Sequence, residues 1–169
     1  MRLVSCCIAA LCLAACGGPS GSCSGTLGPS TLNAELGGET KVLFGGGLER
    51  NRIARMVLDY GDGALFVDTE LWLPANQGMS AVPFGEGAPE RPIAEGLVTR
   101  FRVPEPKGAP AVRSGVFTVR QASATHLEGQ LDVTFADASQ AHCTFDVSGK
   151  TTIEDDQIPI EPPLGPIEP

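Results

Sequence analysis

The most regular feature of the chain is a strict alternation of apolar and polar residues between positions 127 and 135. Leu127 and Phe135 begin and end the apolar series, and Glu128 begins the polar one. Successive side chains of a β-strand point to opposite faces, so this pattern is typical of a strand with one face in a core and the other toward water. The segment therefore predicts a half-buried strand.

Shorter segments with strand character recur along the chain. They lie at residues 31–36, 41–44, 97–103, 116–121 and 142–147, with two more in 51–73. The 21 glycines and 14 prolines favour short strands joined by turns, and no segment predicts a helix. The chain is therefore expected to be all-β, an antiparallel β-sandwich or small barrel of about eight strands.

Residues 51–73 predict a β-hairpin. Gly61-Asp62 matches a two-residue type II′ turn, which has glycine at its first central position. This turn pairs Leu58 with Leu65. It also pairs Arg55 with Asp68, and an opposite-charge pair contributes roughly 0.2–1 kcal/mol. The apolar face and the charge pair thus indicate the same register.

Composition predicts the domain boundaries. Residues 16–30 are rich in Gly, Ser and Pro and are expected to form a flexible tether, whereas residues 31–149 should form the β-sandwich. Within that domain the 74–95 segment contains four prolines and predicts a long loop, of a length that is usually functional or disordered. Residues 150–169 are acidic and proline-rich, and they predict a disordered tail.

The amino terminus has the pattern of an export signal. Met1 and Arg2 precede an apolar stretch over 3–13 that is too short to span a bilayer, which takes ~20 residues. Leu13-Ala14-Ala15-Cys16 follows, and this motif resembles the lipobox of bacterial lipoproteins. An ordinary secretory signal with a chance cysteine is the alternative.

The lipobox resemblance implies a signal peptide over residues 1–15 and a mature amino terminus at a lipidated Cys16. It places the protein in the bacterial cell envelope, held to a membrane by acyl chains. Gly17 stands where an aspartate would signal retention at the inner membrane, so the outer membrane is expected. The rest of the chain loosely resembles uncharacterised small β-sandwich lipoproteins of bacteria.

Cysteine parity predicts one disulfide. Three of the six cysteines lie in the predicted signal peptide, and Cys16 would carry the lipid, which leaves Cys23 and Cys143 in an oxidising compartment. Alternation places Cys143 on the apolar face of its strand. We predict a Cys23–Cys143 disulfide with Cα atoms ~4.4–6.8 Å apart. Two free thiols are the alternative.

The formal net charge of −8 limits the partners of the protein. An acidic surface repels nucleic-acid phosphates and anionic lipid headgroups, and no basic stripe interrupts it. No nucleic-acid partner is therefore predicted, and contact with the membrane is expected through the lipid anchor. A protein partner and a glycan partner both stay open.

Catalytic and metal-binding patterns are missing from the sequence. It contains neither a Gly-x-Ser-x-Gly elbow nor a Ser-x-x-Lys motif. In a hairpin of the last two strands, His142 would lie opposite residues 134–136, and His126 would be about 26–33 Å away at ~3.3 Å per residue. No catalytic residue, metal ligand or cofactor is predicted.

Trp72 is the one side chain that suggests a ligand site. It shares the polar face of its strand with Asp68 and Glu70, and an aromatic ring beside carboxylates can stack on a sugar. The competing interpretation, which we favour, is that the second sheet or the 74–95 loop buries the ring. We predict a non-enzymatic structural or interaction module. The alternative is a ligand-binding protein that uses Trp72 and the 74–95 loop, with carbohydrate as one candidate ligand.

Overall fold

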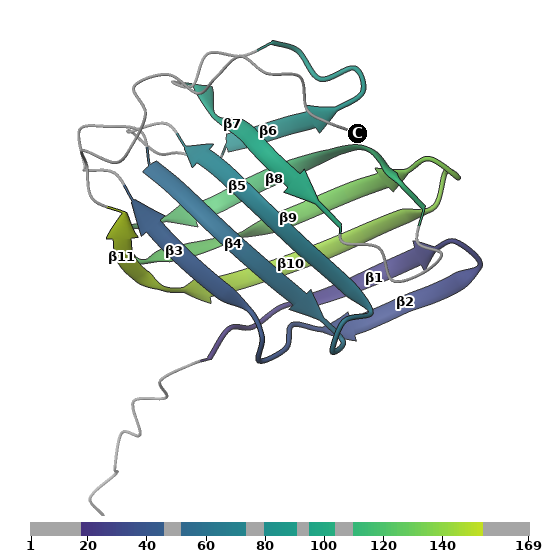
Figure 1. Cartoon of the computed structure of the whole chain (residues 1–169), viewed down its shortest axis with the longest axis horizontal. Helices are drawn as coiled ribbons and strands as arrows, with labels where there is room; N and C mark the ends of the chain where they lie inside the picture. Colours follow the sequence, from purple (N-terminus) through teal and green to yellow (C-terminus); the bar gives the residue numbers. More distant parts are fainter. Residues whose placement is uncertain (1–17, 46–51, 74–79, 91–94, 104–109, 154–169) are drawn as a thin grey trace, which may run out of the picture.

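The computed structural model describes residues 18–45, 52–73, 80–90, 95–103 and 110–153. These residues form two sheets that lie face to face, with the strands of one crossing those of the other (Figure 1). The sheets are not closed into a barrel, so the predicted all-β sandwich is confirmed. No helix in the described part of the chain is long and apolar enough to cross a membrane.

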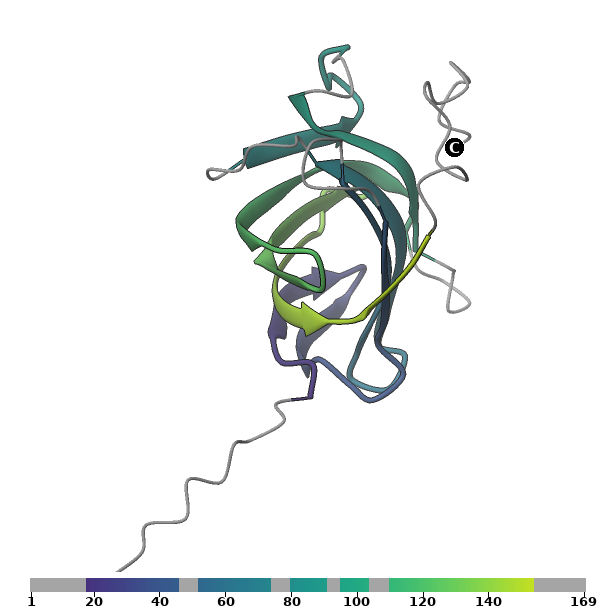
Figure 2. The same cartoon turned by 90° about the vertical axis from the view of Figure 1, so that its left-hand side faces the viewer.

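One sheet has six antiparallel strands. Their order is β2 (Ser30–Glu35), β1 (Ser22–Leu27), β10 (Gln140–Ser148), β9 (His126–Phe135), β8 (Val112–Ala122) and β6 (Ser80–Gly85). The other sheet has four antiparallel strands and a short parallel strand at its edge. Their order is β11 (Lys150–Ile153), β3 (Lys41–Gly45), β4 (Arg52–Tyr60), β5 (Leu65–Leu73) and β7 (Leu97–Arg102). Figure 2 shows the sheets as two curved layers, with β11 leading the chain from one to the other.

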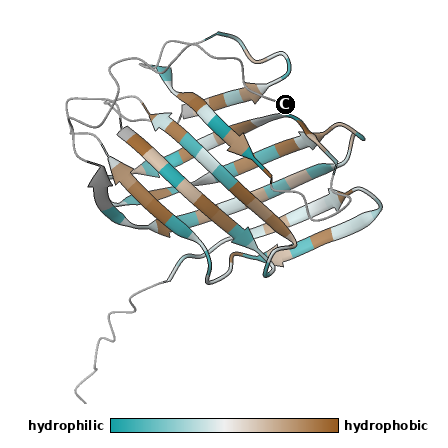
Figure 3. Cartoon of the chain, in the orientation of Figure 1, coloured by the Kyte–Doolittle hydropathy of each residue, from teal (hydrophilic) through white to brown (hydrophobic). Residues whose placement is uncertain are grey.

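The core lies between the two sheets. Apolar and polar bands alternate along the strands in Figure 3, and the predicted inward residues of β9 and β10 are buried. Tyr60 of β4 is fully buried, and its hydroxyl donates a 3.0 Å hydrogen bond to the carbonyl oxygen of Thr144 on the opposite sheet. Burial raises the pKa of Tyr60, so the phenol stays protonated. The two sheets are thus joined by a polar contact inside an apolar core.

The predicted tether is wrong for residues 20–30, which belong to the six-stranded sheet. Ser20 and Asp146 exchange two backbone hydrogen bonds of 2.9 and 2.7 Å, and β1 pairs with both β2 and β10. The glycines that suggested flexibility allow a close approach instead. A Cβ atom on Gly21 would lie 2.1 Å from the carbonyl oxygen of Thr144, and one on Gly25 would lie 2.1 Å from that of Gln140, both in β10.

The Cys23–Cys143 disulfide is present and fully buried. The two cysteines are direct cross-strand partners on β1 and β10, and Cys143 points into the core as predicted. Their Cα atoms are 4.0 Å apart, slightly closer than the predicted range. The bond links positions 120 residues apart and fixes the start of the domain to its last long strand.

Two other predicted boundaries are wrong. Strand β6 lies inside the predicted 74–95 loop, with Val82 and Phe84 buried. Its Pro83 is tolerated because β6 is an edge strand, where a missing N–H group costs no ladder hydrogen bond. Strand β11 extends the sandwich to Ile153, beyond the predicted end at residue 149. Residues 1–17 and 154–169, which carry the predicted signal peptide and most of the predicted tail, lie outside the described residues.

The β4–β5 hairpin forms, but its predicted register is wrong by two residues. Tyr60 pairs with Leu65, so the loop has four residues rather than two. Gly61, Asp62 and Gly63 all have positive φ angles, and the N–H group of Gly63 donates to the Asp59 carboxylate at 2.7 Å. A shift of two keeps every side chain on its predicted face.

Candidate functional site

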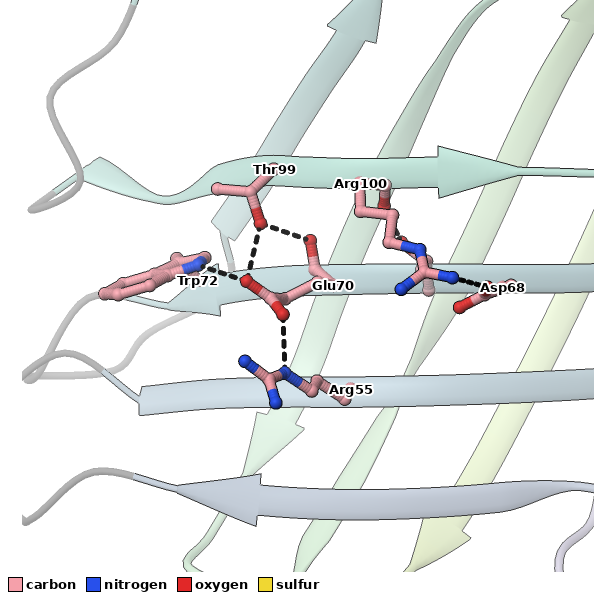
Figure 4. A network of polar contacts seen from close by, with 7 residues as sticks. Arg55, Asp68, Glu70, Trp72, Thr99 and Arg100 are labelled. Carbon is pink, nitrogen blue, oxygen red and sulfur yellow. Dashed lines mark hydrogen bonds and ion pairs between the residues drawn. The ribbon is translucent and has the colours of Figure 1, made fainter. Parts of the chain in front are cut away.

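The outer face of the five-stranded sheet brings together the three predicted ligand-binding residues. Alternation along β5 places Asp68, Glu70 and Trp72 on this face, away from the main core, as the sequence predicts (Figure 4). Strand β4 adds Arg55, which lies directly opposite Glu70 and not opposite Asp68 as predicted. The predicted Arg55–Asp68 pair is therefore replaced by Arg55–Glu70.

A β-bulge in β7 completes the cluster. Arg100 pairs with Glu70 and Val98 pairs with Leu71, so Thr99 is an extra residue between two consecutive pairs. A bulge changes the direction of side chains beyond it. Thr99 and Arg100 therefore both reach acidic side chains on the outer face, whereas Val98 is buried in the core. Regular alternation over 97–103 would place Thr99 and Arg100 on opposite faces, and the bulge brings them to the same one.

Glu70 is the centre of this cluster, which we call the Glu70 network: Arg55, Asp68, Glu70, Trp72, Thr99 and Arg100. Its Oε2 atom accepts a 2.6 Å hydrogen bond from Nε of Arg55. Its Oε1 atom accepts from Trp72 Nε1 at 3.1 Å and from Thr99 Oγ1 at 2.9 Å (Figure 4). Three donors from three strands thus converge on one carboxylate.

The protonation of Glu70 follows from these contacts. Desolvation by burial acts to raise its pKa, but the hydrogen bonds from Arg55, Trp72 and Thr99 and the positive charge of Arg55 outweigh it. The net result is a pKa below the ordinary value. Glu70 is therefore ionised near neutral pH.

Asp68 is held in a second ion pair beside Glu70. The Arg100 guanidinium reaches Asp68 from β7, although the direct cross-strand partner of Asp68 there is Arg102. The buried Thr69 hydroxyl donates to the carbonyl oxygen of Arg100 at 2.9 Å, which fixes the backbone of β7 at the bulge. Both carboxylates of the predicted site therefore hold neighbouring strands together.

Trp72 is only 4% exposed, so the ring is buried as the favoured interpretation predicts, but the apolar neighbours found among the described residues belong to its own sheet and not to the second sheet or the 74–95 loop. Its ring packs with Ile53 and Leu97 in a small apolar cluster separate from the main core. Its indole N–H group is used by Glu70. In this arrangement neither the ring nor its donor is presented to a ligand, and the Glu70 network acts chemically as a rigid cross-link among β4, β5 and β7.

The two histidines lie on the outer face of the other sheet. His126 Nε2 is 2.8 Å from Asp146 Oδ1, and His142 Nδ1 is 2.5 Å from Asp132 Oδ1. His142 lies opposite Asp132 and not opposite residues 134–136 as predicted, because β9 and β10 stay paired up to Thr134 and Gln140 and the turn between them is shorter. His126 lies opposite Ser148, six residues further along β10 than His142, so the two histidines are about 20 Å apart along the sheet. No three His, Cys, Asp or Glu side chains in the described ranges are grouped to hold a metal ion.

A surface hollow of about 440 Å³ lies on the outer face of the five-stranded sheet, near the β4–β5 turn. Lys41, Val57, Asp59 and Phe66 contribute to its lining. Asp59 is committed to the turn through its bond to Gly63.

Comparison of the chain with protein-family models, curated proteins and solved structures found no match.

Proposed function

We propose that this protein is a lipoprotein of the bacterial cell envelope, expected at the outer membrane, whose β-sandwich serves as a non-enzymatic structural or interaction module. In this proposal residues 1–15 form a signal peptide and Cys16 carries the lipid. The domain then begins almost immediately after the anchor.

One observation carries the proposal: the sandwich is fixed to its own amino-terminal segment close to Cys16. Ser20 is already hydrogen-bonded to β10, and the buried Cys23–Cys143 disulfide follows three residues later. Disulfides persist in exported proteins, because the cytosol keeps thiols reduced. A buried disulfide near the lipobox therefore supports an exported domain that is built to stay near its anchor.

The Glu70 network supports the role of a module rather than that of a ligand site. The Glu70 carboxylate accepts three hydrogen bonds, and Asp68 is paired with Arg100. Groups that are satisfied within the protein stabilise the face that carries them. A carbohydrate-binding role for Trp72 and the 74–95 loop would require the ring to become uncovered.

Lipidation is tested by expressing the full chain in a bacterium and analysing its membrane fraction by mass spectrometry. We expect an acylated amino-terminal peptide that begins at Cys16. Cys16→Ser should remove the protein from the membrane fraction. Cys12→Ser, a matched change within the apolar stretch, should leave lipidation intact. A soluble mature protein with an unmodified Cys16 would contradict the proposal.

A further inference from the structure

The first fixed point of the domain after Cys16 is Ser20. Two backbone hydrogen bonds join Ser20 to Asp146, and the disulfide at Cys23 secures the same strand. The hydrogen bonds hold the chain at Ser20, an isolated bridge just before β1, and the disulfide holds it covalently three residues later. The spacer between anchor and domain is therefore only Gly17, Gly18 and Pro19.

The spacer is short compared with the sandwich. The four residue steps from Cys16 to Ser20 span at most about 14 Å when fully extended. From β1, the first strand after Ser20, the six-stranded sheet extends four interstrand spacings to β6, about 19 Å at ~4.8 Å each. Because the spacer is shorter than this distance, the domain cannot invert and stand on its β6 edge at the membrane.

Backbone hydrogen bonds identify the end of the sandwich that lies beside Ser20. Leu36 donates to the carbonyl of Gly21 at 2.9 Å, and Gly37 donates to the carbonyl of Asp59 at 2.6 Å. We call residues 36–40 and 59–64 the anchor-side turns. Figure 1 shows them at the same lower edge as the start of β1, with β6 and β7 at the opposite edge.

From this geometry we infer that the anchor-side turns are the surface that faces the lipid bilayer, and that the β6 edge points away from it. The inference rests on the proposed lipidation of Cys16. The partner of this surface is a layer of lipid headgroups, and the β6 and β7 edge is open to the envelope space.

The chemistry of the anchor-side turns selects the kind of headgroup. Exposed carboxylates of Glu39 and Asp62 lie there, and the ammonium of Lys41, next to these turns, pairs with Glu39 at 3.4 Å, so two acids stand against one base. Anionic headgroups repel carboxylates over roughly 8 Å at physiological salt, within the reach of the spacer. Zwitterionic headgroups carry no such repulsion. The surface therefore fits a zwitterionic bilayer, and the acyl chains rather than charge hold it there.

The test uses the purified lipidated protein in phosphatidylcholine vesicles that contain a quencher lipid. A fluorophore is attached at Glu39→Cys or, as the matched control on the far edge, at Glu90→Cys; both sites are exposed. The native pair Cys23 and Cys143 is buried in its disulfide and does not react. Quenching at position 39 should exceed quenching at position 90 by about twofold or more, because position 39 lies in the anchor-side turns and position 90 follows β6, whose edge points away from the membrane.

A longer spacer provides the second measurement. Insertion of about ten Gly/Ser residues between Gly17 and Gly18 raises the root-mean-square reach to roughly 19–22 Å, and the difference between the two labels should then be lost. Equal quenching at both positions in the acylated native-length protein would overturn the inference alone. Failure to find acylated Cys16 by mass spectrometry would overturn the proposed function and the inference with it.

Discussion

The indole nitrogen of Trp72 donates a 3.1 Å hydrogen bond to Oε1 of Glu70, two residues earlier on the same face of β5. This hydrogen bond holds the indole ring against Ile53 and Leu97 on the outer face of the sheet, on the side away from the main core. At this end β5 is covered on both faces, since its inward neighbours Leu71 and Leu73 are buried as well. An outer face of this kind stabilises the sheet.

The emission of Trp72 reports this burial directly, because it is the only tryptophan in the chain. The native protein should emit at short wavelength, resist quenching by acrylamide and shift to the red when unfolded in urea. Added glycans should leave the spectrum unchanged. A red native emission that moves on addition of a glycan would instead support the carbohydrate-binding alternative.

Replacing Glu70 should weaken the sheet more than replacing an exposed acid. Glu70→Gln loses the charge that Arg55 contacts, and we expect a loss of about 1–2 kcal/mol in the free energy of unfolding. Glu39→Gln removes the partner of Lys41, a pair that is mostly exposed to water, and should cost less than about 0.5 kcal/mol. Urea denaturation measures both. Equal effects of the two changes would show that the Glu70 network is not a cross-link.

The lowered pKa of Glu70 makes stability depend on pH. Its pKa in the folded protein lies below the ordinary value of 4.5, so the ionised form stabilises the fold. This contribution is complete above the unfolded-state pKa and is lost as the pH falls through the folded-state pKa. Stability measured between pH 6 and pH 3 should fall less steeply in Glu70→Gln than in the native chain. Parallel curves would contradict this assignment.

Removing the disulfide should loosen β1 and β2 first. In the chain-entropy model a loop closed over 120 residues is worth ~4–5 kcal/mol, and the double change Cys23→Ala and Cys143→Ala forfeits it. Hydrogen exchange of the β1 and β2 amides should become faster, and the denaturation midpoint should fall. Ser24→Ala, at an exposed neighbouring position, is the control and should change stability by less than ~0.5 kcal/mol. Unchanged protection of β1 in the double variant would refute the role of the bond as a clamp.

Gly129 should be intolerant of even a methyl group. A Cβ atom there would lie 2.5 Å from the carbonyl oxygen of Thr118 and 2.8 Å from Cζ of Phe145, the ring of its cross-strand partner. We expect Gly129→Ala to destabilise the protein by about 1–3 kcal/mol through overpacking. Gly38→Ala, where a Cβ atom meets nothing within 4 Å, is the matched control. Thermal unfolding of both variants decides the point, and an equal midpoint for the two would contradict it.

The alternation of side chains by itself determined the strands that bury one face, and parity of the cysteines determined the disulfide. Leu131, Val133 and Cys143 point inward as predicted, because the period of two is a property of each strand alone. The placement of Asp68, Glu70 and Trp72 on one face followed from the same local rule.

Only the tertiary structure decided what depends on a neighbouring strand. Gly21 and Gly25 read as a tether in the sequence, yet they allow β1 to lie against β10. The partner of Arg55 depended on a four-residue turn, which is held by a side chain outside the turn. Thr99 reaches Glu70 through a bulge, which exists only as a mismatch between two paired strands. Pairing and register arise between segments, so no period within one segment encodes them.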